Sequence, residues 1–268
     1  MKTFKPLLLA AIVAITIYAC STVPLTGRSQ LSLVSDDQIN PAAAASYKEL
    51  LSDPKTVVVS SGTDAQRVKR IGQQLAVAIE QYLNTNGYAN QYSFQWEFNL
   101  IKSDEINAWC MPGGKVAVYS GLLPVAQTDA GLAVVMGHEI GHAIARHSAE
   151  RMSQQLALQA GGTAVGAATG NKSAATQAVI GQLYGVGGQL ALLKYSRAQE
   201  SEADRLGLTF MAMAGYDPRQ AVAFWQRMAA QNKGGTPPEF LSTHPSDATR
   251  IANLQKLIPE ALKYYKGK

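Results

Sequence analysis

Residues 138–142 read His-Glu-Ile-Gly-His, the strongest chemical signal in the chain. Histidines four apart lie on one face of an α-helix, about 40° apart around its axis, so both imidazoles can bind one Zn²⁺. Glu139 between them can accept a proton from a water at the metal. The flanking residues are apolar, so this helix is predicted to be buried, where unsatisfied polar groups are costly. The alternative is a helix with two hydrogen-bonded histidines and no metal.

A catalytic zinc site needs a third protein ligand and an open fourth position. A third histidine six residues after His142 would complete the metzincin pattern, but that position holds Ser148. His147 is one residue away and, on a continuous helix, would point about 140° from His142. We therefore expect His147 at the surface or behind a ligand, and we look for the third ligand elsewhere.

The acidic stretch 196–207 offers that ligand. Glu200 and Asp204 are four residues apart and share a helical face. We predict that Glu200 binds the metal and that Asp204 orients a ligand histidine. Glu202 lies on a different face and is expected in solvent. Without the histidine motif, the whole stretch would be interpreted as the charged surface of a helix.

Together these segments resemble the gluzincin metalloproteases that include HtpX, the CAAX prenyl proteases and periplasmic quality-control metalloproteases. Residues 107–114 resemble that family's Asn-Ala-x-x-x-Pro-Gly-Gly segment, and Thr243-His244-Pro245 with Arg250 resembles its C-terminal His-Pro segment. The match spans roughly residues 60–260 in the same order. The chain is most similar to the small lipoprotein branch, because it lacks the multiple membrane spans of the other members.

The resemblance implies a zinc-dependent endopeptidase with one Zn²⁺ per chain and Glu139 as general base. It also implies that His244 and Arg250 face the metal cleft. His244 would either stabilise the oxyanion or occupy the open zinc position and keep the enzyme latent, and Arg250 would clamp an oxyanion or a carboxylate. Helix capping and surface positions are the alternatives for both. The metal ligands would be His138, His142 and Glu200.

The expected substrates, misfolded or unassembled envelope proteins, come from the resemblance alone. The alternative function is a latent or weakly proteolytic zinc-binding chaperone or assembly factor for envelope proteins. Twenty-four Lys and Arg against 19 Asp and Glu give a net charge of +5, or +3 without Lys2 and Lys5. This charge is too small and too dispersed to indicate nucleic-acid binding.

The N-terminus has the features of a lipoprotein signal peptide over residues 1–19. A basic start is followed by a short apolar stretch and by Ile17-Tyr18-Ala19-Cys20, which resembles a bacterial lipobox. Cys20 would carry the lipid, residues 20–35 would form a tether, and 36–268 a single metallopeptidase domain. This predicts a protein anchored to the periplasmic side of a bacterial envelope, at the inner or outer membrane. A plain secretory signal and an uncleaved anchor are alternatives.

The elements around the motif predict an α+β fold, predominantly helical and zincin-like, with a small β-sheet beside the active-site helix. Helices are expected at 38–51, 64–83 and 221–231, and strands at 92–98 and 115–119. Residues 107–111 are the candidate edge strand for an extended substrate, and Pro112-Gly113-Gly114 either approaches the cleft or turns an ordinary hairpin. Residues 160–188 form two packed helices or a lid. Cys110 is expected to be free and buried.

Overall fold

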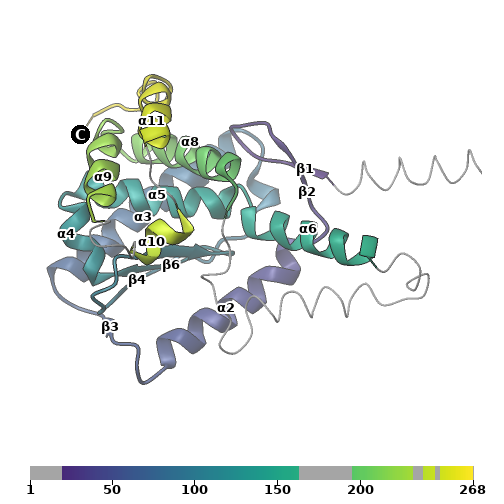
Figure 1. The fold of residues 1–268 in the computed structure, drawn as a ribbon, viewed down its shortest axis with the longest axis horizontal. Coiled ribbons are helices and arrows are strands. Elements are labelled where there is room, and N and C mark those ends of the chain that lie inside the picture. Colours follow the sequence, from purple (N-terminus) through teal and green to yellow (C-terminus); the bar gives the residue numbers. More distant parts are fainter. Residues whose placement is uncertain (1–19, 163–194, 232–237, 245–247, 268) are drawn as a thin grey trace, which may run out of the picture.

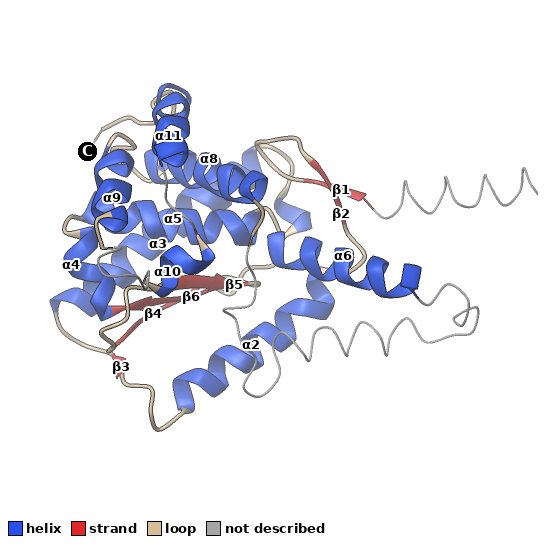
Figure 2. Ribbon diagram, viewed as in Figure 1, coloured by secondary structure: helices blue, strands red, loops and turns tan. Residues whose placement is uncertain are grey.

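The computed structural model describes residues 20–162, 195–231, 238–244 and 248–267. Helices predominate and the strands form two small sheets, so the predicted helix-rich α+β fold is confirmed (Figure 2). The strands are β1 Cys20–Thr22, β2 Ser29–Leu31, β3 Val58–Val59, β4 Glu97–Ile101, β5 Ala108–Met111 and β6 Lys115–Tyr119. The α-helices are α2 Asp36–Ser52, α3 Thr63–Thr85, α4 Leu123–Ala126, α5 Asp129–Ile144, α6 His147–Gly162, α8 Arg197–Met213, α9 Gln220–Ala229, α10 Glu239–Thr243 and α11 Ala248–Ala261. Two short 3₁₀ helices, η1 Ala89–Gln91 and η2 Ser120–Leu122, complete the described elements.

The main sheet has the strand order β3-β4-β6-β5, with β4 and β6 parallel and the other pairs antiparallel. Successive side chains of a strand point to opposite faces. Val116 and Val118 of β6 accordingly join the core with α3 and α5, whereas Ala117 joins the core with α2. The sheet therefore lies between α2 on one face and the helical layer of α3 and α5 on the other (Figure 1).

The predicted edge strand is present as β5, which stands at the end of the strand order. Pro112-Gly113-Gly114 connects it to β6 as the turn of a hairpin. Both glycines have positive φ, and a methyl group on Gly114 would lie 2.6 Å from the Trp96 ring. Cys110 on β5 forms no disulfide, as expected, but it is half-buried and not buried as predicted.

The strand predicted at 92–98 is wrong for its first part, because β4 begins only at Glu97. The alternating aromatic side chains stack instead, with ring centroids 5.4 Å apart for Tyr92–Phe94 and 4.4 Å for Phe94–Trp96. The backbone N–H of Gln95 donates to the Gly113 carbonyl (2.9 Å) in the hairpin turn. The alternating aromatic residues at 92–96 therefore form a row of stacked rings. They precede β4 and are not part of the β-sheet.

The expected tether is also corrected, because residues 20–31 are folded against the domain. β1 and β2 pair as an antiparallel hairpin, and Val23 is fully buried. Figure 1 shows this hairpin beside α6 and the end of α8. Among the described residues, no helix is long and apolar enough to cross a membrane. The predicted signal peptide and almost all of the Gly/Ala-rich segment lie outside the described residues.

Candidate metal centre

The predicted motif helix is α5, and it is almost entirely buried. The Thr128 side chain caps its N-terminus by accepting a hydrogen bond from the Gly131 N–H (3.0 Å), which satisfies one of the free donors of the first turn. Apolar residues cover the rest of the helix, so His138, Glu139 and His142 are buried within the core at 1%, 4% and 3% exposure. Such polar groups need partners, and α8 supplies most of them.

Small residues let α8 approach α5 closely. A methyl group on Gly207 would lie 2.8 Å from the backbone nitrogen of His138, and one on Gly141 would lie 2.8 Å from the Ala203 carbonyl oxygen. Both distances are shorter than any side chain tolerates, so only glycine fits at these crossings. The close approach brings the Glu200 carboxylate of α8 to the two histidines of α5.

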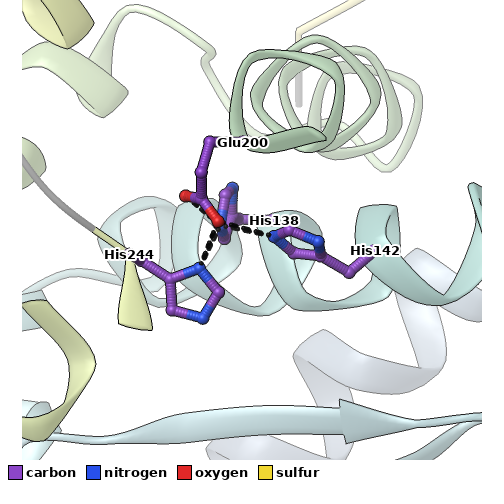
Figure 3. Close-up of side chains that lie close together, drawn as sticks. All are labelled: His138, His142, Glu200 and His244. Carbon is purple, nitrogen blue, oxygen red and sulfur yellow. Dashed lines mark hydrogen bonds and ion pairs between the residues drawn. The ribbon is translucent and has the colours of Figure 1, made fainter. Parts of the chain in front are cut away.

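Four side chains converge at this crossing: His138, His142, Glu200 and His244 (Figure 3). His138 Nε2 lies 3.1 Å from His142 Nε2 and 3.2 Å from His244 Nδ1. Glu200 Oε1 lies 2.8 Å from His244 Nδ1 and 3.4 Å from His142 Nε2. One possible ligand atom from each of the four residues lies within 4.8 Å of all the others.

These separations fit a bound Zn²⁺. With zinc–nitrogen bonds of about 2.0–2.1 Å, the ligand atoms of a tetrahedral site are about 3.3 Å apart. The four separations given above, 2.8–3.4 Å, lie near that value, and all the ligand atoms lie within 4.8 Å of one another. The donor set of imidazole nitrogens and a carboxylate oxygen is also one that zinc prefers. The residues present therefore fit the metal.

Glu139 stands beside this cluster with one carboxylate oxygen that accepts no hydrogen bond from the described residues. Its Oε1 is buried and has no hydrogen-bond partner among the described residues, and His244 Nε2 lies 3.5 Å away. Burial, partly opposed by His244, raises the pKa of Glu139 to about 7. A buried carboxylate with a free oxygen and a pKa near neutrality is suited to proton transfer.

The structure places Asp204 and Arg250 together behind His138. Asp204 Oδ1 lies 2.9 Å from His138 Nδ1, on the side of the ring away from the cluster. Arg250 donates to both oxygens of Asp204 (2.6 and 2.9 Å) and to Glu200 Oε2 (3.0 Å), and its guanidinium stacks over Trp225 at 3.4 Å from the ring centroid. Arg250 therefore clamps the protein's own carboxylates, and its surface alternative is wrong because it is 7% exposed.

His147 takes the second of its two expected positions, behind a ligand histidine, whereas the expectation that Glu202 lies in solvent is wrong. The helix does not continue through His147, because α5 ends at Ile144 and Arg146 adopts a left-handed backbone with φ of 53°. The chain therefore turns, and His147, fully buried, lies with Nδ1 2.8 Å from His142 Nδ1. Its Nε2 lies 2.9 Å from Glu202 Oε2, and Glu202 is only 7% exposed.

Tyr195 is a neighbour of the cluster that sequence reasoning missed. Its ring stacks on His142 with the centroids 3.9 Å apart, and its hydroxyl lies 3.2 Å from the Ser148 hydroxyl. Tyr195 stands just before the acidic stretch, with no spacing that relates it to the histidine motif. The available signal was therefore weak.

A buried helix carrying two histidines and a glutamate, with a carboxylate supplied by a second helix, defines a zincin-like metallopeptidase site. The chain belongs to peptidase family M48, whose model matches residues 63–258. It is a member of a metalloendopeptidase family whose peptidases depend on zinc.

Similar proteins come from mitochondria and from bacteria. The chain is 32% identical to the mitochondrial metalloendopeptidase OMA1 of Schizosaccharomyces pombe, over 89% of this chain and 66% of that protein. It is also 32% identical to human OMA1, over 90% of this chain and 46% of that protein. The beta-barrel assembly-enhancing protease of Escherichia coli is 30% identical, over 75% of this chain and 47% of that protein. The chain thus spans 46–66% of the length of these relatives.

Proposed function

We propose that this protein is a zinc-dependent endopeptidase that cleaves proteins of a bacterial envelope, including unassembled or misfolded ones. The observation that carries the proposal is the convergence of four possible ligand atoms, all within 4.8 Å of one another, beside a buried glutamate with an oxygen that has no hydrogen-bond partner among the described residues. The relatives named for endopeptidase activity and for beta-barrel assembly support the substrate class. The branch of small lipoproteins remains our proposal within the M48 family.

In this proposal His138, His142 and Glu200 hold one Zn²⁺ per chain. Zinc supplies a Lewis acid that polarises the scissile carbonyl and makes water a better nucleophile. Glu139 accepts the proton of the attacking water and delivers it to the nitrogen of the leaving amine. The edge strand β5 beside α5 offers backbone groups to an extended substrate, which it would bind as an added strand.

His244 is proposed to hold the enzyme in a resting state. Its Nδ1 lies among the other ligand atoms, at the position of a fourth ligand, whereas its Nε2 faces Glu139. This geometry favours occupation of the open zinc position over oxyanion stabilisation, because a ring already inside the cluster blocks the site that substrate needs. Cleavage would then require His244 to move away.

Membrane attachment through a lipid on Cys20 is proposed for the periplasmic side of the envelope. β1 begins at Cys20, which is exposed, so an acyl chain there would reach the bilayer without burying the hairpin. Mass spectrometry of the N-terminal peptide tests this directly. A lipid-modified Cys20 supports the anchor, and an unmodified internal Cys20 in the mature protein excludes it.

The decisive test of the function compares casein hydrolysis by the zinc-quantified wild type and Glu139→Gln. Both proteins should bind one zinc, because Glu139 is no ligand. The variant should lose on the order of 10²–10⁴-fold in rate, since a general base contributes about that much. His244→Ala separates the alternatives. If this variant cuts faster than wild type, the enzyme is latent. If His244→Ala binds zinc and neither this variant nor the wild type hydrolyses casein, the chaperone function replaces the endopeptidase function.

A further inference from the structure

The ring of His142 is fixed by a chain of polar contacts that leads away from the metal cluster. For His142 Nε2 to offer a lone pair to a metal, its Nδ1 must carry the proton. That proton then points to His147 Nδ1 at 2.8 Å, and His147 in turn donates from Nε2 to Glu202 Oε2 at 2.9 Å. This assignment follows from the partners of each nitrogen, and every group in the chain is buried.

The chain of contacts ends in the N-terminal hairpin. Arg28, in the loop between β1 and β2, donates from Nε to Glu202 Oε2 (2.7 Å), and the Thr26 hydroxyl donates to Glu202 Oε1. Arg28 also donates to both oxygens of Glu150 on α6, at 2.8 and 3.0 Å. The hairpin thus reaches across more than 170 residues of sequence to hold one carboxylate of α8.

Arg28 bridges two carboxylates that have little access to water. Glu202 and Glu150 are 7% and 6% exposed, and without the guanidinium between them they would repel each other in a weakly screened environment. Glu202 would then move away from His147, and the His142 ring would lose the group that sets its orientation and tautomer. Groups of this kind change metal affinity although they never touch the metal.

We propose that the hairpin β1–β2 positions the metal centre, with Arg28 as the positioning residue. Through Glu202 and His147, Arg28 holds His142 in the orientation that binds zinc. The inference rests on the proposed zinc site and adds a part of the chain that lies before the matched family region, which begins at residue 63. The N-terminal segment is therefore part of the working site.

The test measures the zinc dissociation constant of the full chain by chelator competition. Glu202→Gln keeps the size of the side chain and should weaken zinc binding about 10–100-fold, the usual cost of losing such a partner. Arg28→Ala should also weaken zinc binding. Arg28→Lys should recover part of the loss, because lysine keeps the charge but not the two-pronged geometry. The visible spectrum of the cobalt-substituted variants should also change, since it reports the ligand geometry.

Arg67→Ala is the matched control, because Arg67 makes a similar bond to Asp129 (2.7 Å) at the start of α5. Its zinc affinity should stay that of wild type. If Arg28→Ala does not fold, Thr26→Val removes a single donor to Glu202 and should weaken zinc binding less. Wild-type affinity and spectrum in the folded variants, or an equal loss in Arg67→Ala, would overturn the inference. Wild-type protein that binds no zinc would instead refute the proposed function.

Discussion

The two histidines of the motif are supported in different ways. His138 meets its carboxylate directly, since Asp204 Oδ1 lies 2.9 Å from Nδ1 and Arg250 of α11 holds Asp204 from behind. His142 Nδ1 contacts another histidine, His147, and it is His147 that contacts the carboxylate of Glu202. Burial and Arg250 favour a neutral His138 ring, but Asp204 and Glu200 outweigh them and raise its pKa, whereas burial lowers the pKa of His142 well below the usual value.

The difference shows that one helix can present two ligands that depend on different parts of the chain. The support of His138 is sealed inside the core by Trp225 and Arg250. The support of His142 ends at Arg28, whose side chain is 33% exposed. We therefore expect the first support to contribute mainly to stability, and the second to tune metal binding at a smaller cost to the fold.

The largest effect should come from Asp204→Ala. This change leaves the buried guanidinium of Arg250 without its main partner, and breaking a buried ion pair costs about 3–5 kcal/mol. The matched variant Glu202→Ala should cost less, because Arg28 is partly solvated and keeps Glu150. Urea unfolding of the metal-free proteins measures both. A loss at Glu202 equal to or larger than the loss at Asp204 would contradict the proposed asymmetry.

Gly207→Ala should disturb both supports together. Asp204 and Glu202 stand on the same helix, and a methyl group on Gly207 would lie 2.8 Å from the His138 backbone nitrogen. The obstructing atoms, His138 N and the Gly137 carbonyl group, all belong to backbone. Helix α8 must therefore shift away from α5, and overpacking of this kind costs about 1–3 kcal/mol. Unfolding and zinc binding should both weaken. A variant as stable as wild type with normal zinc affinity would show that the helix spacing is less strict than the contacts indicate.

The sequence predicted the parts of the site that follow helical spacing. His138 and His142 share a face of α5, and Glu200 and Asp204 share a face of α8. A spacing of four residues was therefore enough to predict that the members of each pair lie together. The amphipathic helix predicted at 64–83 is α3, and the strand at 115–119 is β6. These predictions depend only on local patterns of the sequence. They hold in the folded protein because the apolar residues of each pattern must be buried.

Expectations failed where a distant segment decided the outcome. Glu202 was expected in solvent because it lies on a different face of its helix from Glu200 and Asp204, but its partners Arg28 and Thr26 come from more than 170 residues away. The segment that contains them has few apolar residues and so gave no sign of folding. The roles of the grouped residues in binding zinc and in catalysis remain predictions that the variants above test.

His147 lies behind a ligand as one of the two expectations had it, but the assumption that it stands on one continuous helix with His142 failed for a different reason. The prediction with the smallest expected effect tests that reason. A helical wheel assumes one continuous helix, yet the backbone of Arg146 has φ of 53°, a region that costs a non-glycine residue about 1–2 kcal/mol. Arg146 is held there by Asp36 (2.8 Å) and by Tyr92, whose ring centroid lies 4.1 Å from the guanidinium carbon.

Arg146→Gly and Arg146→Ala both lose these contacts, but only glycine relieves the backbone. The glycine variant should therefore be more stable than the alanine variant by about 1 kcal/mol in urea unfolding. At Gln154, an exposed position within α6, the order should reverse, because alanine is the better helix former by about 1 kcal/mol. The same order at both positions would mean that the left-handed turn at Arg146 does not set the path of the chain. The return of His147 to His142 would then need another explanation.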